Sequence, residues 1–141
     1  MPKVKMFRFM NTIEFLKFMS GEELHNITKH KAKTNSIGFC FFGMNDVTPE
    51  YAWKFLKGAV IPDLCAVFEV DENKLKKGYG IYSDPNKSLY ELMNFIPKSI
   101  AVPEYSTTKY SNQEFKLIKY TKYKLNLFQR YEKFEWVEAN K

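Results

Sequence analysis

Three polar residues stand where a core strand would normally carry an apolar side chain. Arg8 interrupts the run VKMFRFM, Ser36 opens the run SIGFCFF, and Glu104 follows Pro103 in the segment IAVPEYS. An arginine binds a phosphate through two parallel hydrogen bonds, and a serine hydroxyl bonds to a sugar or an amide. A glutamate carboxylate stabilises the positive charge that develops on a sugar carbon when a leaving group departs. Together the three residues would form a cleft for a phosphorylated sugar.

The spacing of the apolar residues predicts the strands that carry these side chains. Residues 4–10 alternate, with Met6, Arg8 and Met10 on one side and Phe7 and Phe9 on the other, as in a strand. The segment TNSIGFCFF is apolar on both faces after its polar start, which favours a central strand. A further strand is predicted for LCAVFEVD, and most of the last third of the chain also alternates.

Two helices are predicted between these strands. Asn11 suits the N-cap of the first helix, with Glu14 three residues later as its capping-box partner. The residues that we expect this helix to bury are Ile13, Leu16 and Met19. Thr48 and Pro49 suit the start of the second helix. The order strand, helix, strand, helix, then mostly strands predicts one α+β domain over residues 1–141 with a largely antiparallel sheet.

The composition excludes several classes of protein. With 45% hydrophobic and 17% aromatic residues, the chain is rich enough in apolar side chains to form a packed core rather than a disordered region. No apolar run approaches the roughly 20 residues that a membrane-spanning helix needs, so we expect no membrane partner. Cys40 and Cys65 both lie in apolar runs, which predicts reduced, buried thiols and a cytoplasmic protein.

Common motifs for catalysis or cofactor binding are absent from the sequence. It contains neither of the usual glycine-rich patterns that bind phosphates, nor the G-x-S-x-G turn of serine hydrolases. His25 and His30 do not form a zinc-ligand pattern, so we expect no metal site. Arg8, Ser36 and Glu104 are therefore the residues on which a chemical function would depend.

The order of these features resembles that of small bacterial ADP-ribosyltransferases. The segment KMFRFMNTIEFLKFMSGEEL looks like the opening of that family, in which an aromatic-arginine pair ends the first strand and a short helix and a glycine follow. TNSIGFCFF looks like the family's Ser-Thr-Ser strand, with Thr34 and Ser36 at the outer hydroxyl positions and Asn35 in the middle. Ala52 and Phe55 match the Ala-x-x-Phe helix that follows that strand.

This resemblance implies an ADP-ribosyltransferase-like fold of two small, mainly antiparallel sheets with a few short helices and a cleft for NAD. It implies transfer of ADP-ribose from NAD, the substrate, to a macromolecular acceptor, either a protein or a nucleic acid, without a metal. Arg8, Thr34 and Ser36 would bind the phosphate and the ribose, while Glu104 would bond to the ribose 2′-hydroxyl and stabilise the oxocarbenium ion. The aromatic residues that could stack on the nicotinamide are Phe42, Tyr51 and Tyr105.

The resemblance leaves two candidates for the catalytic glutamate. Glu104 follows a loop and begins a strand-like segment, which suits the family's position for this residue. Glu114 directly precedes the apolar strand FKLIKY and has Asn112 two residues earlier, similar to the family's Gln/Glu-x-Glu signature, whereas Glu104 has Val102 at that position. We favour Glu104 and keep Glu114 as the alternative.

A non-catalytic basic binding module is the alternative function. The net charge of +6 favours an acidic partner, such as a nucleic acid or an acidic protein surface. Lysines alternate with aromatic residues in KYTKYKLNLFQRYEKF, a pattern that could stack bases and pair with phosphates, but that is also typical of a half-exposed strand. Such a module could use a degenerate transferase fold that binds nucleotides or a partner protein without turnover.

Overall fold

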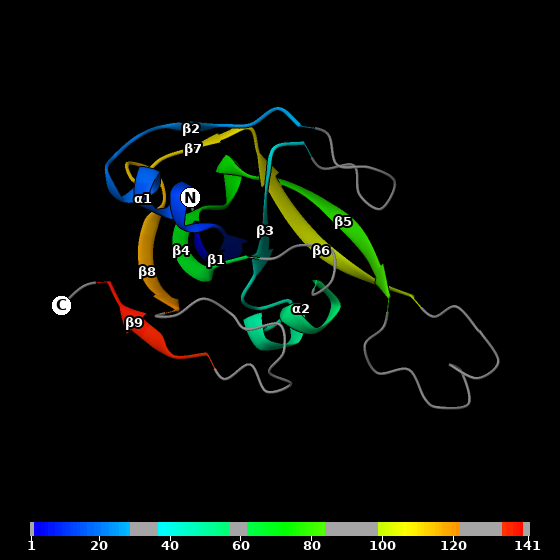
Figure 1. Ribbon diagram of the computed structural model, residues 1–141. Coiled ribbons are helices and arrows are strands. Elements are labelled where there is room, and N and C mark those ends of the chain that lie inside the picture. Colours follow the sequence, from blue (N-terminus) through cyan, green and yellow to red (C-terminus); the bar gives the residue numbers. More distant parts are fainter. Residues whose placement is uncertain (1, 29–36, 57–61, 84–98, 122–133, 140–141) are drawn as a thin grey trace.

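The computed structural model describes residues 2–28, 37–56, 62–83, 99–121 and 134–139 (Figure 1). These residues form nine strands, two α-helices and one short 3₁₀ helix. In chain order the elements are β1 (Lys3–Met10), α1 (Thr12–Met19), β2 (Leu24–His25), β3 (Phe39–Gly43), α2 (Pro49–Leu56), β4 (Leu64–Asp71), η1 (Glu72–Lys74), β5 (Lys76–Ser83), β6 (Ser99–Thr107), β7 (Lys109–Tyr110), β8 (Lys116–Thr121) and β9 (Trp136–Glu138).

Seven strands form one antiparallel sheet in the order β5-β6-β3-β1-β4-β8-β9, and β2 pairs with β7 in a separate sheet. The predicted α+β class and the mainly antiparallel pairing are thus confirmed. The two sheets are unequal in size, because β1 lies between β3 and β4 and joins the strands on both sides into one ladder. The expected pair of small sheets is therefore one large sheet and one two-stranded sheet.

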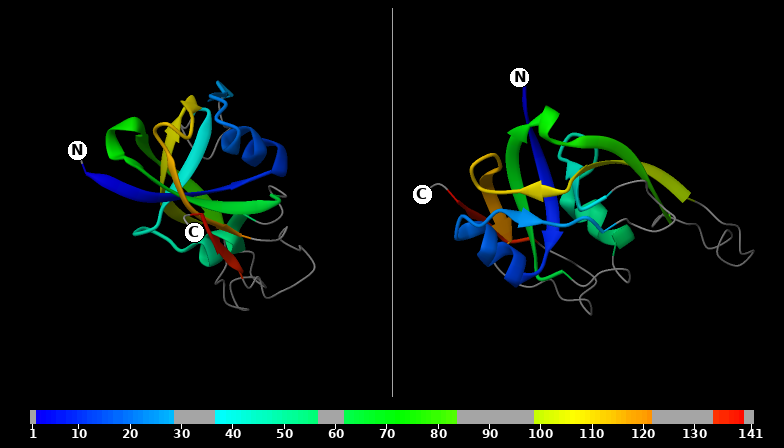
Figure 2. Two further views of the ribbon diagram at one scale, coloured as in Figure 1. Left: turned by 90° about the vertical axis from the view of Figure 1, so that its left-hand side faces the viewer. Right: turned by 90° about the horizontal axis from the view of Figure 1, so that it is seen from above.

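The large sheet is apolar on both faces, and a different helix covers each face (Figure 1). We call the face that carries Phe41 and Tyr105 the α1 face, because Phe18 of α1 packs against the same cluster. We call the face that carries Phe42 the α2 face, because Trp53 of α2 is fully buried against it. Figure 2 shows β2 and β7 side by side next to α1, so the small sheet lies on the α1 face.

Helix α1 begins as the sequence predicts but buries different residues. The side chain of Asn11 accepts a hydrogen bond from the backbone N–H of Glu14 at 2.8 Å, which confirms the N-cap. The three residues expected to be buried are each at least half exposed, so this prediction is wrong: Ile13, Leu16 and Met19. Instead, Phe18 is buried and its ring packs 5.0 Å from that of Phe68 and 5.6 Å from that of Tyr110.

Helix α2 and the cysteines largely follow their predictions. The hydroxyl of Thr48 accepts a hydrogen bond from the backbone N–H of Tyr51 at 3.2 Å, as expected of an N-cap. Both cysteines are reduced; Cys65 is buried, whereas Cys40 in β3 is only half-buried. Burial raises the pKa of the Cys65 thiol well above its ordinary value, so this thiol stays protonated at neutral pH.

Candidate functional site

Arg8 lies in β1 and is paired with Glu14. Its Nε and Nη2 atoms donate to the two carboxylate oxygens of Glu14 at 2.7 and 2.9 Å, and its Nη1 atom donates to the carbonyl oxygen of Cys40 at 3.2 Å. The guanidinium carbon lies 5.1 Å from the centre of the Phe39 ring, within the range of a cation–π contact. All three guanidinium nitrogens are therefore engaged by the protein itself.

Tyr110 completes this cluster from β7. Its hydroxyl donates a short hydrogen bond to Oε2 of Glu14. Burial, together with the charge of Glu14, raises the pKa of Tyr110 above its usual range, so the hydroxyl remains a donor at neutral pH. Burial alone would lower the pKa of Arg8, but the contacts with Glu14 outweigh it and raise the pKa overall. The cluster ties the first strand, the first helix and the small sheet together.

Arg8 and Glu104 lie on opposite faces of the large sheet. The guanidinium of Arg8 lies over the ring of Phe41 at 5.9 Å, and Phe41 pairs with Tyr105 across β3 and β6, which places all three on the α1 face. Successive side chains of a strand point to opposite faces, so Glu104, the neighbour of Tyr105, points to the α2 face. The structure therefore does not bring Arg8 and Glu104 into the one cleft that we expected.

The other residues predicted for the cleft lie either outside the described residues or in another part of the sheet. Thr34 and Ser36 lie outside the described residues, so their roles stay predictions. Glu114, the alternative catalytic residue, lies in the turn before β8, and its carboxylate pairs with the ammonium group of Lys74 at 2.7 Å. Strand β8 is separated from β6 by β3, β1 and β4, so Glu114 and Glu104 belong to different parts of the sheet.

Glu104 is a buried carboxylate in β6. Its exposed fraction is 1%, and its Oε1 atom accepts a short hydrogen bond from the hydroxyl of Tyr82 in β5. The carboxylate lies directly over the backbone of Gly80, where an added Cβ atom would come within 1.7 Å of Oε1. Burying a carboxylate is unfavourable unless it is well paired, and such groups concentrate at functional sites. We therefore take Glu104 as the centre of the candidate site.

Two glycines of β5 lie beside Glu104: the carboxylate covers Gly80, whereas Gly78 is open. Because side chains alternate along a strand, Lys76, Gly78, Gly80 and Tyr82 share one face of β5. Gly78 pairs with Glu104 across β5 and β6, and a Cβ atom added to Gly78 would meet no described atom within 4 Å. The carboxylate thus borders an open strip of backbone on which a flat or small group, such as a sugar ring, could lie.

Two more polar side chains, one from β3 and one from β6, point to the α2 face together with Glu104. Ser106 follows Glu104 by two positions and pairs with Cys40 of β3, so both point to the α2 face. We define the Glu104 site by the following residues: Cys40, Gly78, Gly80, Tyr82, Glu104 and Ser106. Burial and the hydrogen bond to Glu104 raise the pKa of Tyr82 above its usual range, so at neutral pH Tyr82 is a fixed donor that orients the carboxylate.

The predicted nicotinamide-stacking residues are divided between the two faces. Phe42 lies on the α2 face with Glu104, and its ring is buried 6.3 Å from that of Tyr82. Tyr105 lies on the α1 face, and its hydroxyl donates to the carboxylate of Asp46 at 3.2 Å. Tyr105 is therefore separated from the Glu104 site by the sheet itself.

Tyr51, the third of these residues, lines a pocket next to the Glu104 site. The pocket has a volume of about 440 Å³, and its lining includes Thr48 and Tyr51 of α2 and its cap together with Val102 of β6. Val102 precedes Glu104 by two positions and so lies on the same face of β6. The pocket places an aromatic side chain beside the site, and the binding role of Tyr51 stays a prediction.

The basic segment of the alternative function lies mostly outside the described residues. Its first residues, Lys119 to Thr121, belong to β8. The ammonium group of Lys119 lies 4.6 Å from the centre of the Trp136 ring in the neighbouring strand β9. In the described part of this segment, Lys119 thus packs against an aromatic ring of the neighbouring strand.

The two glycines of β5 provide a matched pair of stability tests. Gly80→Ala places a methyl group against the Glu104 carboxylate, so we expect the free energy of unfolding to fall by about 1–3 kcal/mol. Gly78→Ala places the same group in open space, and we expect a change of at most about 0.5 kcal/mol. Urea denaturation of both variants measures the difference. Equal stability of the two variants would contradict the position that we assign to the carboxylate.

Two buried tyrosines, Tyr105 and Tyr110, and the half-buried Tyr82 predict a loss of stability at high pH. Burial and neighbouring carboxylates raise the pKa of Tyr105 to about 12 and those of Tyr82 and Tyr110 above the usual range. The folded state therefore holds these protons at a pH where the unfolded chain, with tyrosine pKa values of about 10, releases them. Their contribution is complete below pH 10 and is lost as the pH rises toward 12 and beyond. Urea denaturation should give a nearly constant free energy of unfolding between pH 8 and 9 and a steep decrease above pH 10, and Tyr82→Phe should reduce that decrease.

Sequence reasoning missed most members of the Glu104 site. Residues 78–83 lie within β5, whose full length pairs with β6. The sequence does contain a signal for this site: every second residue from 78 to 82 is Gly78, Gly80 and Tyr82. In an edge strand this pattern leaves one face with two glycines and a single phenol side chain. That signal becomes interpretable only when the pairing of Gly78 with Glu104 is known.

Comparison with family models, curated proteins and solved structures finds no match for this chain. In the ranges of the chain that the structure describes, no helix is long and apolar enough to cross a membrane. The same ranges contain no cluster of three or more histidine, cysteine, aspartate or glutamate side chains that could hold a metal ion. Function must therefore be inferred from the geometry of the Glu104 site together with the sequence resemblance.

Proposed function

We propose that this protein is an NAD-dependent mono-ADP-ribosyltransferase with an ADP-ribosyltransferase-like fold, and that it transfers ADP-ribose to a protein or a nucleic acid. The observation that carries the proposal is the buried carboxylate of Glu104 beside the open backbone at Gly78. An anionic group and a surface without side chains meet at one point, which suits a sugar ring that becomes positively charged. The sequence resemblance implies that this sugar is the ribose attached to nicotinamide.

In the proposed reaction, the bond between ribose C1′ and the nicotinamide nitrogen breaks, and its electron pair leaves with nicotinamide. The positive charge that develops on C1′ and the ring oxygen is stabilised by the Glu104 carboxylate, which also accepts a hydrogen bond from the 2′-hydroxyl. A nucleophilic atom of the acceptor then bonds to C1′ and releases its proton to water. Tyr82 contributes by holding the carboxylate in one orientation through its hydroxyl.

Arg8 has a structural role in this proposal. Its contact with a phosphate of NAD, which the resemblance implies, would require breaking both hydrogen bonds to Glu14 and moving the guanidinium to the other face. Thr34 and Ser36 keep the ribose-supporting role that the resemblance implies. The pocket that Tyr51 lines offers an aromatic surface for nicotinamide next to the carboxylate.

A thermal-shift experiment with a Gly78→Val variant tests the proposal. NAD at about 100 times its dissociation constant is expected to stabilise the wild-type protein by roughly 2.7 kcal/mol. Valine suits an edge strand, and a Cβ atom added at this position meets no described atom within 4 Å, so the variant should fold normally while its side chain fills the space beside Glu104. We therefore expect Gly78→Val to retain the melting temperature of the wild type without ligand and to lose most of the shift with NAD.

Labelling with radioactive NAD provides the second measurement. The wild-type protein is expected to transfer label from NAD to a component of a cell extract, and Gly78→Val is not. If NAD produces neither a thermal shift nor labelling, the transferase proposal is wrong. If the protein does not bind NAD but binds nucleic acid with an affinity that falls steeply with salt, the result would instead support the non-catalytic basic module.

A further inference from the structure

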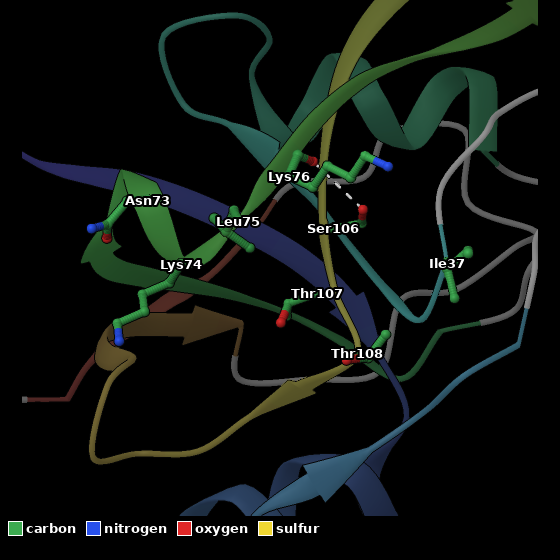
Figure 3. A pocket seen from close by; sticks show the side chains of 8 residues that line it. All are labelled: Ile37, Asn73, Lys74, Leu75, Lys76, Ser106, Thr107 and Thr108. Carbon is green, nitrogen blue, oxygen red and sulfur yellow. Dashed lines mark hydrogen bonds between the residues drawn. The ribbon is translucent and has the colours of Figure 1, made fainter.

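A second pocket lies at the opposite end of β5 and β6 from the pocket that Tyr51 lines (Figure 3). It has a volume of about 390 Å³ and is formed by η1, the start of β5 and the end of β6, with Ile37 facing them. Its charged and hydroxyl-bearing lining consists of Lys74, Lys76, Ser106, Thr107 and Thr108. None of the described residues that line it carries a carboxylate, so the lining combines positive charge with hydroxyl groups.

The two lysines of this pocket differ in their partners. The ammonium group of Lys74 pairs with Glu114 at 2.7 Å, which offsets its charge. Lys76 forms no ion pair with any residue in the described part of the chain, and its side chain is exposed. Lys76 therefore supplies a positive charge at the pocket that a bound anion could neutralise.

Ser106 provides a buried hydroxyl beside that charge. Its exposed fraction is 6%, and Figure 3 shows the hydroxyl directed toward the backbone of Lys76. The distance from its oxygen to the Lys76 carbonyl oxygen is 3.5 Å, which is long for a hydrogen bond between two oxygens. A ligand oxygen at a normal distance would be a better partner for this hydroxyl.

The threonines extend the same surface at the end of β6. The hydroxyl of Thr107 donates to the carbonyl oxygen of Lys109 at 2.8 Å and so holds the turn between β6 and β7. Thr108 is exposed at the rim of the pocket. Ser106 and Thr108 therefore supply hydroxyl donors at two depths of the pocket.

We propose that this pocket binds the phosphate or pyrophosphate group of a small phosphorylated molecule. Lys76 neutralises the charge, while Ser106 and Thr108 donate hydrogen bonds to the phosphate oxygens, as hydroxyl groups and lysines do at phosphate sites. The volume of about 390 Å³ is within the range of small-molecule sites and exceeds what one phosphate needs, so the ligand carries a further group such as a sugar. The pocket shares Ser106 with the Glu104 site, but phosphate binding does not depend on ADP-ribose transfer.

The position of the pocket indicates the direction in which such a ligand extends. Ser106 lies two positions from Glu104 on the same face of β6, and Lys76 lies two positions from Gly78 on the same face of β5. A phosphorylated sugar with its phosphate at Lys76 can therefore place its sugar over the bare backbone at Gly78. The two sites would then hold different parts of one ligand.

Calorimetric titration tests this site without reference to catalysis. The probes are inorganic phosphate, pyrophosphate and ADP-ribose, each added to the full chain at one fixed ionic strength. We expect pyrophosphate and ADP-ribose to bind more tightly than inorganic phosphate. The variant Lys76→Gln should weaken pyrophosphate binding about tenfold, because it removes a charged donor to the anion.

Lys77 provides the matched control. It is the next residue of β5 and carries the same charge, but it points to the α1 face, where its ammonium group lies 5.9 Å from the centre of the Tyr105 ring. Lys77→Gln should therefore change pyrophosphate binding less than about twofold, whereas Ser106→Ala should weaken it measurably. Equal losses in Lys76→Gln and Lys77→Gln, or no binding of any probe, would overturn the proposal. The Glu104→Gln variant should still bind pyrophosphate, so a failure of transfer does not mask the result.

Discussion

Replacing Glu104 by glutamine is expected to lower the rate of ADP-ribose transfer by about two to three orders of magnitude while NAD still binds. Glutamine has almost the same shape and keeps an oxygen that accepts the hydrogen bond of Tyr82, so the fold should be retained. It lacks the negative charge, which is the property that stabilises a positively charged sugar in the transition state. The measurement is the rate of nicotinamide release together with the dissociation constant for NAD.

Glu114→Gln is the control for this prediction. Its carboxylate pairs with Lys74 in the turn before β8, which three strands separate from β6 in the sheet. Removal of that charge should leave the transfer rate close to that of the wild type. If Glu114→Gln abolishes transfer and Glu104→Gln does not, the catalytic carboxylate has been assigned to the wrong glutamate.

Replacing Glu14 by alanine is expected to destabilise the protein by about 3 kcal/mol. The substitution removes both hydrogen bonds to Arg8 and the acceptor of the Tyr110 hydroxyl. It leaves the guanidinium, whose side chain is only 18% exposed, over the ring of Phe39 without a counter-ion. Breaking a largely buried ion pair by removing one partner is much more destabilising than breaking an exposed pair. The free energy of unfolding from urea denaturation measures the effect.

The comparison of stability with activity decides whether the Arg8 cluster, formed by Arg8, Glu14 and Tyr110, is structural. Glu114→Ala breaks an exposed pair and is expected to change the stability little, which makes it the matched control. Glu14→Ala should also retain the wild-type transfer rate per folded molecule, because the Glu104 site lies on the other face of the sheet. A normal free energy of unfolding with a lost transfer rate would instead place the Arg8 cluster in the active site.

The parts of the fold that were predictable are those that local patterns determine. The alternation around Arg8, the Asn11 cap and the Thr48 cap depend on neighbours within a few residues, and each is present in the structure. Helix α1 shows where local patterns fail, because it carries apolar residues on two sides. The sequence does not reveal which side of the helix packs against the sheet. In the structure it is the side that carries Phe18, whose ring packs beside that of Phe68.

The site was less predictable because it depends on register. Arg8 and Glu104 are separated by β3, and a shift of one residue in either pairing would move one of them to the other face. The partner of Arg8 illustrates the same point. Glu14 was predicted as the capping-box partner of Asn11; its backbone N–H does donate to the Asn11 side chain, but its own side chain pairs with Arg8. The sequence contains both Arg8 and Glu14 without indicating that their side chains pair.

Mapping of NAD binding by NMR tests the central claim most directly, because glycine amides give well-separated signals and two glycines mark the site. Titration of NAD into isotope-labelled protein should shift the amide signals of Gly78 and Gly80 together with those of Tyr82 and Glu104. The amides around Arg8, on the opposite face, should move little. Shifts confined to the Arg8 cluster, with Gly78 and Gly80 unchanged, would contradict the assignment of the site to Glu104.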